Sequence, residues 1–187
     1  MPTEPSSKLP TVLVLASGRG ERFAASGGTV HKLQASLAGR TVLERTLAAV
    51  RASGLSWHLE DAGHPGMGDS IAAAVAATPN ACGWLILPAD LPLVLPETLR
   101  AVANALLPNE GGHEVVVPVV QGQRGHPVGF AAVCRADLLK LQGDRGAASV
   151  IRSHDASELI VDDIGCVTDI DTLDDLARAE ALLRRAG

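Results

Sequence analysis

The segment Val12–Lys32, VLVLASGRGERFAASGGTVHK, constrains the fold more strongly than any other part of the chain. It begins with a short apolar run bounded by glycines, which is typical of a buried central strand in a parallel sheet. A glycine-rich turn with arginines follows, and the segment ends at a single lysine. A turn of this kind between a strand and a helix offers backbone N–H groups to an anion. The segment therefore predicts a buried strand that leads into a phosphate-binding loop.

The loop itself does not match the usual phosphate-binding signatures. A GxGxxG fingerprint needs a further glycine and a P-loop needs GK[ST], whereas the sequence here is Gly18-Arg19-Gly20-Glu21-Arg22. On these residues alone, phosphate binding and an ordinary glycine-rich turn are equally good interpretations. Arg22 and Lys32 favour phosphate, because a triphosphate requires cationic groups as well as backbone donors. The alternative is that both are solvated surface cations.

Strand and helix patterns alternate along the rest of the chain. Apolar runs typical of buried strands are WLILPAD, which ends at Asp90, EVVVPVV at residues 114–120 and SELIVDD at residues 157–163. A helix is predicted to begin after Thr41, with Glu44 completing a capping box, and to end at Gly54. Further helices are predicted over residues 70–77, 97–107 and 173–186. The alternation predicts an α/β fold, with a mostly parallel sheet and helices on both of its faces.

Length and composition fit one globular domain. A chain of 187 residues, 47% of them hydrophobic, is long enough for one well-packed core and short for two. We expect a flexible leader at residues 1–10 and a single domain over residues 11–187. The formal net charge of −5 argues against a protein that binds nucleic acid through a basic face.

The sequence gives no sign of export or of a metal site built on cysteine. Cys82, Cys134 and Cys166 lack the spacing of metal ligands or of a disulfide framework. No stretch approaches the roughly 18 apolar residues that a membrane span needs, and the N-terminus lacks the apolar region of a signal peptide. We therefore expect a cytoplasmic protein with no membrane contact.

Polar residues follow several of the predicted strands. They are Ser17–Arg22, Asp90 and Arg124–His126, and ligands of open α/β sheets bind at the carboxyl ends of the strands. Asp90 is either a cap or a ligand for a hard divalent ion. Asp169-Ile170-Asp171 offers further carboxylates, although Asp171 or Thr172 could instead cap the last helix.

The histidines and Ser17 are less informative. On spacing alone His126 is a loop histidine, and His58, His64 and His154 show no partner pattern and are assigned no role. Ser17 lacks the GxSxG elbow of a serine hydrolase. An oxidoreductase that uses FAD or NAD is a weak alternative, because no GxGxxG fingerprint is present.

Taken together, these residues resemble the MobA-like nucleotidyltransferase family, a Rossmann-like, three-layer group that includes molybdenum cofactor guanylyl- and cytidylyltransferases. The matching segments, in order, are LASGRGERF followed by Lys32, GRTVLERTLAAVRASG, GMGDSIAAAV, WLILPADLPLV, VVVPVVQGQRGHPVGF, LQGDRGAASVI and VTDIDTLDDLARAE. Each segment alone is a weak signal, but their shared order makes the resemblance specific.

The resemblance implies a role for each matching residue. Catalytic roles fall to Arg22, Lys32 and Asp90. Contacts to the nucleotide fall to Leu15, Ala16, Ser17, Gly18, Arg19, Gly20, Lys32, Gly66, Met67, Gly68 and Ser70. Contacts to the acceptor substrate fall to Arg124, Gly125, His126 and Pro127, and Mg²⁺ ligands are implied at Asp90, Asp169 and Asp171.

The implied reaction is attack by an acceptor phosphate on the α-phosphorus of a nucleoside triphosphate, with release of pyrophosphate. Positioning and charge neutralisation suffice for it, without a protein nucleophile. The loop reads LASG, closer to the LAAG of the cytidylyl branch than to the LAGG of the guanylyl branch, so CTP is favoured. The expected acceptor is molybdopterin or another phosphorylated pterin-type molybdenum cofactor, and a molybdoenzyme that receives it is a candidate partner.

Three alternatives stay open. The protein could use GTP, it could use another phosphorylated acceptor such as a sugar phosphate, or it could be a degenerate member that binds the cofactor for a molybdoenzyme without turnover. Two departures from the family pattern bear on them. Residues 55–69 are shorter than the usual segment beside the base pocket, and the extension AASGGTVH separates Lys32 from Arg22. Its glycines would let the extension fold back over the phosphates.

Overall fold

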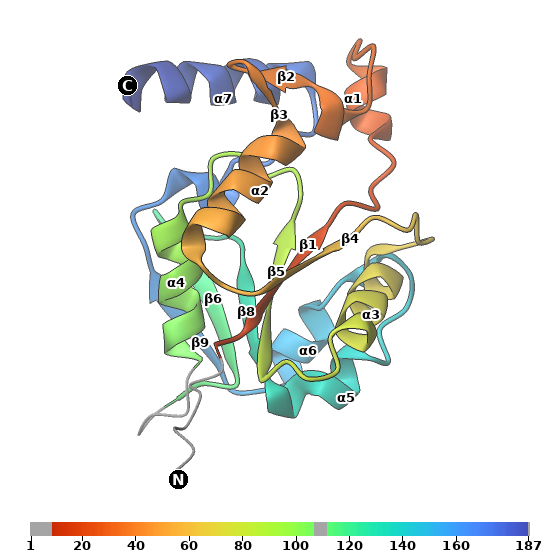
Figure 1. Ribbon diagram of the computed structural model, residues 1–187, viewed down its shortest axis with the longest axis vertical. Helices are drawn as coiled ribbons and strands as arrows, with labels where there is room; N and C mark the ends of the chain where they lie inside the picture. The colour runs from red at the N-terminus through yellow and green to blue at the C-terminus, as the bar shows by residue number, and fades with distance from the viewer. Residues whose placement is uncertain (1–8, 107–111, 187) are drawn as a thin grey trace, which may run out of the picture.

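The computed structural model describes residues 9–106 and 112–186, so most of the predicted leader and the predicted helix end at Leu107 lie outside the described residues. The described chain forms one large sheet with helices against both faces (Figure 1). The strands of this sheet are β1 (Thr11–Leu15), β4 (Trp57–Glu60), β5 (Gly83–Pro88), β6 (Val115–Val120), β7 (Gln123–Arg124), β8 (Val128–Ala131) and β9 (Ala156–Ile160).

The sheet is mixed rather than fully parallel. Its order is β4-β1-β5-β8-β6-β7, and β9 also pairs with β6. Strands β4, β1 and β5 run parallel, as does the β6–β9 pair. Strand β8 runs antiparallel between β5 and β6, and the short β7 is antiparallel to β6. The predicted α/β fold is confirmed, and the apolar run after the Arg124 turn is an inserted antiparallel strand.

Helices cover both faces of the sheet, as expected (Figure 1). On one face lie α2 (Val42–Ser53) and α4 (Pro96–Ala105), and on the other lie α3 (Met67–Ala77), α5 (Arg135–Leu138) and α6 (Ala148–Ser153). Beyond one end of the sheet lie α1 (Glu21–Ala25), α7 (Leu173–Ala186) and a hairpin of β2 (Ser36–Leu37) and β3 (Arg40–Thr41). No helix among the described residues is long and apolar enough to cross a membrane.

Strand β1 divides the core into two layers. Val12 and Val14 belong to the cluster that contains residues of α2 and α4, whereas Leu13 and Leu15 belong to the cluster that contains residues of α3. Successive side chains of a strand point to opposite faces, so a strand that is apolar at every position must be covered on both sides. The uninterrupted apolar run therefore places β1 at the centre of a three-layer fold.

The N-terminus of α2 confirms the predicted capping box. The Thr41 hydroxyl accepts a hydrogen bond from Glu44 N at 3.1 Å, and the Glu44 carboxylate accepts one from Thr41 N at 2.7 Å. Gly54 ends the helix in the left-handed region, with φ 73°. Caps of this kind contribute about 1 kcal/mol each.

Helix α3 begins earlier than predicted. We expected it to start at Ser70, but it starts at Met67 and its N-cap is Gly66. Gly66 and Gly68 pack directly against the backbone of residues 142–144, where a Cβ atom on either glycine would collide. The Asp69 carboxylate, in the first turn of α3, accepts a hydrogen bond from Gly143 N at 3.0 Å. The start of α3 therefore depends on a contact that is distant in sequence.

A buried carboxylate fixes the segment that follows β9. Asp163 is 4% exposed. It accepts hydrogen bonds from Leu95 N at 2.9 Å, Thr98 Oγ1 at 2.7 Å and Gly165 N at 2.9 Å. Leu95, the N-cap residue of α4, has no side chain that can accept a hydrogen bond, so Asp163 supplies an acceptor at this end of the helix from a distant part of the chain. The segment that carries Asp169 and Asp171 is thereby held against α4.

We expect Asp163→Ala to lower the free energy of unfolding by about 2–4 kcal/mol, because it leaves several buried donors without an acceptor. Urea denaturation followed by circular dichroism measures this. The matched control is Asp162→Ala, which removes the neighbouring exposed aspartate and should change stability by less than about 0.5 kcal/mol. Equal effects of the two substitutions would contradict the capping role of Asp163.

Candidate active site

A crevice of about 790 Å³ lies at the carboxyl ends of β1 and β5. It brings together most of the residues proposed for the site. Those that line it are Leu15, Ala16, Ser17, Gly18, Arg19, Gly20, Arg22, Lys32, Gly66, Met67, Ser70, Asp90, Arg124, Gly125, His126, Asp169 and Asp171. Two proposed residues, Gly68 and Pro127, do not line the crevice, and Gly68 is packed beneath Gln142.

The glycine loop is tied down at both ends. At its start, Ala16 N and the Ser17 hydroxyl both donate to the carbonyl oxygen of Glu60, at 2.8 and 3.3 Å. Gly20 adopts a left-handed conformation with φ 66°, which lets the chain turn into α1. A histidine ring nitrogen, His31 Nε2, lies 2.8 Å from the carbonyl oxygen of Gly18. These contacts fix the loop along the crevice that it lines.

The extension after Arg22 folds back on itself. Gly28 N donates to Phe23 O at 3.0 Å, and Gly28 packs so closely on the Phe23 ring that a side chain there would collide. His31 then caps a short 3₁₀ helix, η1 (Lys32–Gln34), by accepting a hydrogen bond from Leu33 N at 3.3 Å. The extension therefore returns Lys32 to the crevice.

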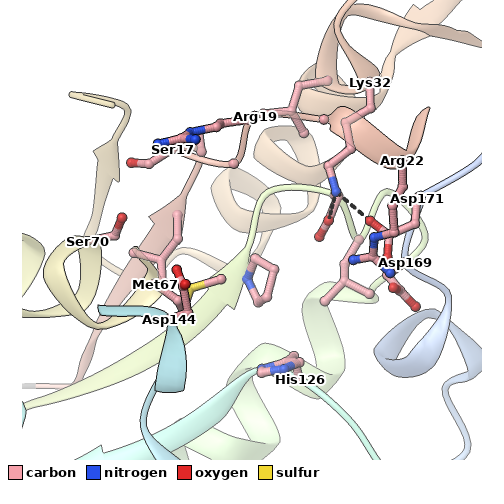
Figure 2. Close-up of a pocket in the computed structure, with 18 of the residues that line it drawn as sticks. Ser17, Arg19, Arg22, Lys32, Met67, Ser70, His126, Asp144, Asp169 and Asp171 are labelled. Carbon is pink, nitrogen blue, oxygen red and sulfur yellow. Dashed lines mark hydrogen bonds and ion pairs between the residues drawn. The ribbon is translucent and has the colours of Figure 1, made fainter. Parts of the chain in front are cut away.

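The Lys32 ammonium lies between two carboxylates (Figure 2). Its Nζ atom is 2.6 Å from Asp90 Oδ2 and 2.8 Å from Asp171 Oδ1, and the Lys32 side chain is 11% exposed. Burial lowers the pKa of Lys32, but the charges and hydrogen bonds of Asp90 and Asp171 outweigh burial and raise it. The amine is therefore charged at neutral pH.

Further charged side chains lie beside Lys32, Asp90 and Asp171. The exposed Arg22 guanidinium is 2.7 Å from Asp171 Oδ2. The pKa of Asp169 is raised, first by burial and then by the negative charges of Asp171 and Asp90. In Figure 2, Arg22, Lys32, Asp169 and Asp171 gather at one side of the crevice, away from Ser17, Ser70 and Met67. Two cations and two carboxylates thus lie together at this end, whereas Arg19 lies beside Ser17 and Asp144 beside Met67 (Figure 2).

The carboxylates at this end suit a hard divalent ion. Asp90 Oδ1 is buried and has no hydrogen-bond partner among the described residues, so it is available to a ligand. Carboxylate oxygens are the donors that Mg²⁺ and Mn²⁺ prefer. The described residues contain no ready-made group of three or more His, Cys, Asp or Glu side chains around a metal position. Instead, the Lys32 ammonium lies between the carboxylates of Asp90 and Asp171 and bonds both of them.

In the segment before α7, the residue that caps the helix differs from the residue whose carboxylate faces the crevice. Thr172 caps the helix, because its hydroxyl accepts from Asp175 N at 3.2 Å while the Asp175 carboxylate accepts from Thr172 N at 2.8 Å. Asp171 is thereby left to face the crevice. The carbonyl oxygen of Asp90 accepts from Ile170 N at 3.0 Å, which holds this segment against the end of β5.

His126 lies in the loop between β7 and β8, as its spacing suggested, and it is half-buried. Its Nδ1 atom is buried and has no hydrogen-bond partner within the described chain. Burial lowers the pKa of His126, so the ring is neutral at pH 7. The backbone beside it is pinned, since His126 N donates to Cys166 O at 2.9 Å. Arg124 is exposed and pairs with Glu158 at 2.7 Å.

Sequence reasoning missed a group on the far wall of the crevice. Glu60, at the end of β4, accepts hydrogen bonds from His64 and His58, and His64 lines the crevice. The three residues follow the order His-x-Glu-x-x-x-His, but only the turn of the chain after β4 brings their side chains together. The spacing of the two histidines in the sequence predicts no such contact.

Comparisons with known proteins agree with this geometry. A sequence model described as the MobA-like NTP transferase domain matches residues 50–158, more than half of the chain, although not the glycine loop. The bifunctional protein GlmU of Xylella fastidiosa is 24% identical over 171 residues, which cover 79% of this chain and 34% of that protein. The 2-C-methyl-D-erythritol 4-phosphate cytidylyltransferase of Frankia casuarinae is 34% identical over 130 residues, which cover 58% of this chain and 47% of that enzyme. The chain thus spans between a third and a half of the length of these relatives.

Solved structures match nearly the whole described fold. The protein Rv0371c of Mycobacterium tuberculosis superimposes with a TM-score of 0.74 at 27% identity, covering 92% of this chain and 98% of that one. A second structure of Rv0371c, in complex with manganese, has a TM-score of 0.71 at 25% identity, with the same coverage of both chains. Three observations assign the chain to the same family: the order of its segments, the sheet with its crevice and the match over residues 50–158. The chain belongs to the MobA-like NTP transferase domain family, a family of nucleotidyltransferases.

Proposed function

We propose that the protein transfers CMP from CTP to molybdopterin, or to its molybdenum-loaded form, with Mg²⁺ as cofactor and release of pyrophosphate. The observation that carries this proposal is the charged end of the crevice. There the Lys32 ammonium and Arg22 guanidinium meet the carboxylates of Asp90, Asp169 and Asp171 beside an open glycine loop. Such a set of charges suits a triphosphate and a divalent ion.

Each group at the charged end has a role in binding or orientation. The backbone of residues 16–22 cradles the phosphates, and Arg22 and Lys32 bind phosphate oxygens. Asp90, Asp169 and Asp171 hold the Mg²⁺ ion. When bound there, a divalent ion would supply positive charge beside the phosphates. The unpartnered Asp90 Oδ1 atom supports a ligand at this carboxylate.

The opposite end of the crevice suits the base of the nucleotide. It is lined by Leu15, Pro65, Gly66, Met67 and Ser70, which provide apolar surface and few charges. Binding pockets for flat rings combine such surface with a small number of polar groups. A nucleotide that spans the crevice therefore places its base beside α3 and its phosphates beside Lys32.

A second cavity supports a ring-containing acceptor. It has a volume of about 340 Å³, shares Met67, Pro88 and Arg124–His126 with the crevice, and is lined mainly by apolar side chains. These include Ile71, Ile86, Val117, Val128, Phe130 and Ile151. Such a lining favours a pterin ring over a polyol, and Arg124 and Arg145 supply cations for the phosphate of the acceptor.

A different phosphorylated acceptor is the second candidate. The observation that favours it is the 34% identity to the Frankia casuarinae enzyme, whose name gives a methylerythritol phosphate as its acceptor and CMP as the group transferred. Both candidates use CTP. They differ in what fills the second cavity.

We expect CTP to give the fastest release of pyrophosphate when the protein is incubated with Mg²⁺, molybdopterin and each radiolabelled nucleoside triphosphate in turn. Asp90→Asn should slow this reaction by at least about 100-fold, because it removes a charge that holds the metal ion. Asp162→Asn is the matched control, since Asp162 is exposed outside the crevice. Absence of turnover with every nucleotide would refute the proposal, and normal activity of Asp90→Asn would remove Asp90 from the site.

We expect Lys32→Met to lower the free energy of unfolding by about 2 kcal/mol in the absence of divalent ions, because Asp90 and Asp171 lose their cation. Mn²⁺ should then raise the melting temperature of Lys32→Met more than that of the wild type. Lys140→Met, which breaks an exposed ion pair with Asp137, is the control. An unchanged stability together with an unchanged response to Mn²⁺ would show that Lys32 does not occupy a cation position.

A further inference from the structure

The short segment after β4 forms a wall of the crevice at its weakly charged end. In the β1–β4 register Glu60 lies opposite Leu15, so β4 ends where the glycine loop begins. Only residues 61–66 separate β4 from α3. Of these residues, His64, Pro65 and Gly66 line the crevice. Since proline and glycine carry no polar side chain, His64 is the residue of this loop that can recognise a base by its side chain.

The Glu60 carboxylate fixes the His64 ring. His64 Nε2 lies 3.0 Å from Glu60 Oε1, and His58 Nε2 lies 3.3 Å from Glu60 Oε2. Burial raises the pKa of Glu60, but hydrogen bonds from His64, His58 and Ala62 N outweigh burial and lower it, so the carboxyl group is ionised. An ionised carboxylate only accepts hydrogen bonds, so the Nε2 atom of His64 must carry a proton.

The tautomer leaves one nitrogen for a ligand. In a neutral imidazole with its proton on Nε2, Nδ1 is a hydrogen-bond acceptor. Within the described chain, His64 makes no hydrogen bond other than the one to Glu60. The side chain is 23% exposed, so it is accessible from the crevice. Ser70, which also lines this end, already donates its hydroxyl to Gly66 O at 3.2 Å.

We propose that His64 determines the base specificity of the enzyme. Its Nδ1 atom accepts a hydrogen bond from the exocyclic amino group of cytosine, whereas uracil presents a carbonyl oxygen at the same position and leaves two acceptors facing each other. Glu60 is a positioning residue, because it sets the tautomer and the orientation of His64. Pro65 and Met67 supply apolar surface for the ring of the base. This inference rests on the proposed function and adds the residue that separates CTP from UTP.

The test measures nucleotide binding, so that it does not depend on the identity of the acceptor. Isothermal titration calorimetry at pH 8 with Mg²⁺ compares CTP with UTP for the wild type and for His64→Ala. The wild type should prefer CTP, and His64→Ala should reduce the ratio of the two affinities by about tenfold or more, through weaker CTP binding. His64→Gln, whose amide oxygen is also an acceptor, should recover part of the preference.

The matched control is His58→Ala. His58 bonds the same carboxylate but does not line the crevice, so its removal should leave the ratio of CTP to UTP affinity unchanged. Glu60→Gln should lower the ratio, because an amide can donate to Nε2 and so moves the proton of His64 to Nδ1. A loss of stability alone would change both affinities and not their ratio.

The outcomes separate this inference from the proposed function. If the wild type prefers CTP and His64→Ala keeps the full preference, the inference is overturned while the nucleotidyltransferase proposal stands. Asp144→Asn changes the exposed carboxylate at this end of the crevice. If Asp144→Asn abolishes the preference for CTP and His64→Ala does not, the inference is likewise overturned while the nucleotidyltransferase proposal stands. A wild-type preference for UTP would also overturn the inference. If the wild type binds neither nucleotide, both proposals fail.

Discussion

The Lys32 ammonium bonds Asp90 at the end of β5 and Asp171 before α7. These partners are 58 and 139 residues away from Lys32 in the sequence, so the contact joins distant parts of the chain. Charges that are largely removed from water must be paired. This pairing draws the extension of the glycine loop, the central sheet and the C-terminal helix to one end of the crevice. The position of α7 is supported by a second link, in which Leu173 N donates to Ser26 Oγ at 3.0 Å.

The two ends of the crevice differ in the charge of the side chains that line them. Its charged end concentrates cations and carboxylates beside the glycine loop, where the strongly charged phosphates belong. Its other end carries fewer charges: Asp144 is exposed there, and the charge of Glu60 is already satisfied by hydrogen bonds. This separation underlies our proposal that the phosphates of a nucleotide bind beside Lys32 and its base beside α3. Residues 124–126, at the end of β7 and just before β8, line the same crevice as the glycine loop.

Features with local causes could be predicted from the sequence. Strand β1 follows from an apolar run, and the start and end of α2 follow from Thr41, Glu44 and Gly54. Features that depend on distant contacts could not. The start of α3 requires the close approach of Gly66 to residues 142–144, and nothing near Glu60 in the sequence shows that it will orient His64. The gathering of the site residues at strand ends was predictable from topology, whereas the bridging position of Lys32 needed the folded extension.

The most direct test of the charged end is a crystal structure with a non-hydrolysable CTP analogue and Mn²⁺, in which anomalous scattering locates the metal ion. We expect the manganese peak to be bonded to Asp90 and Asp171, with the Lys32 ammonium moved from these carboxylates onto phosphate oxygens of the nucleotide. A structure with bound nucleotide in which Lys32 still bridges Asp90 and Asp171, and in which the manganese lies elsewhere, would contradict this arrangement.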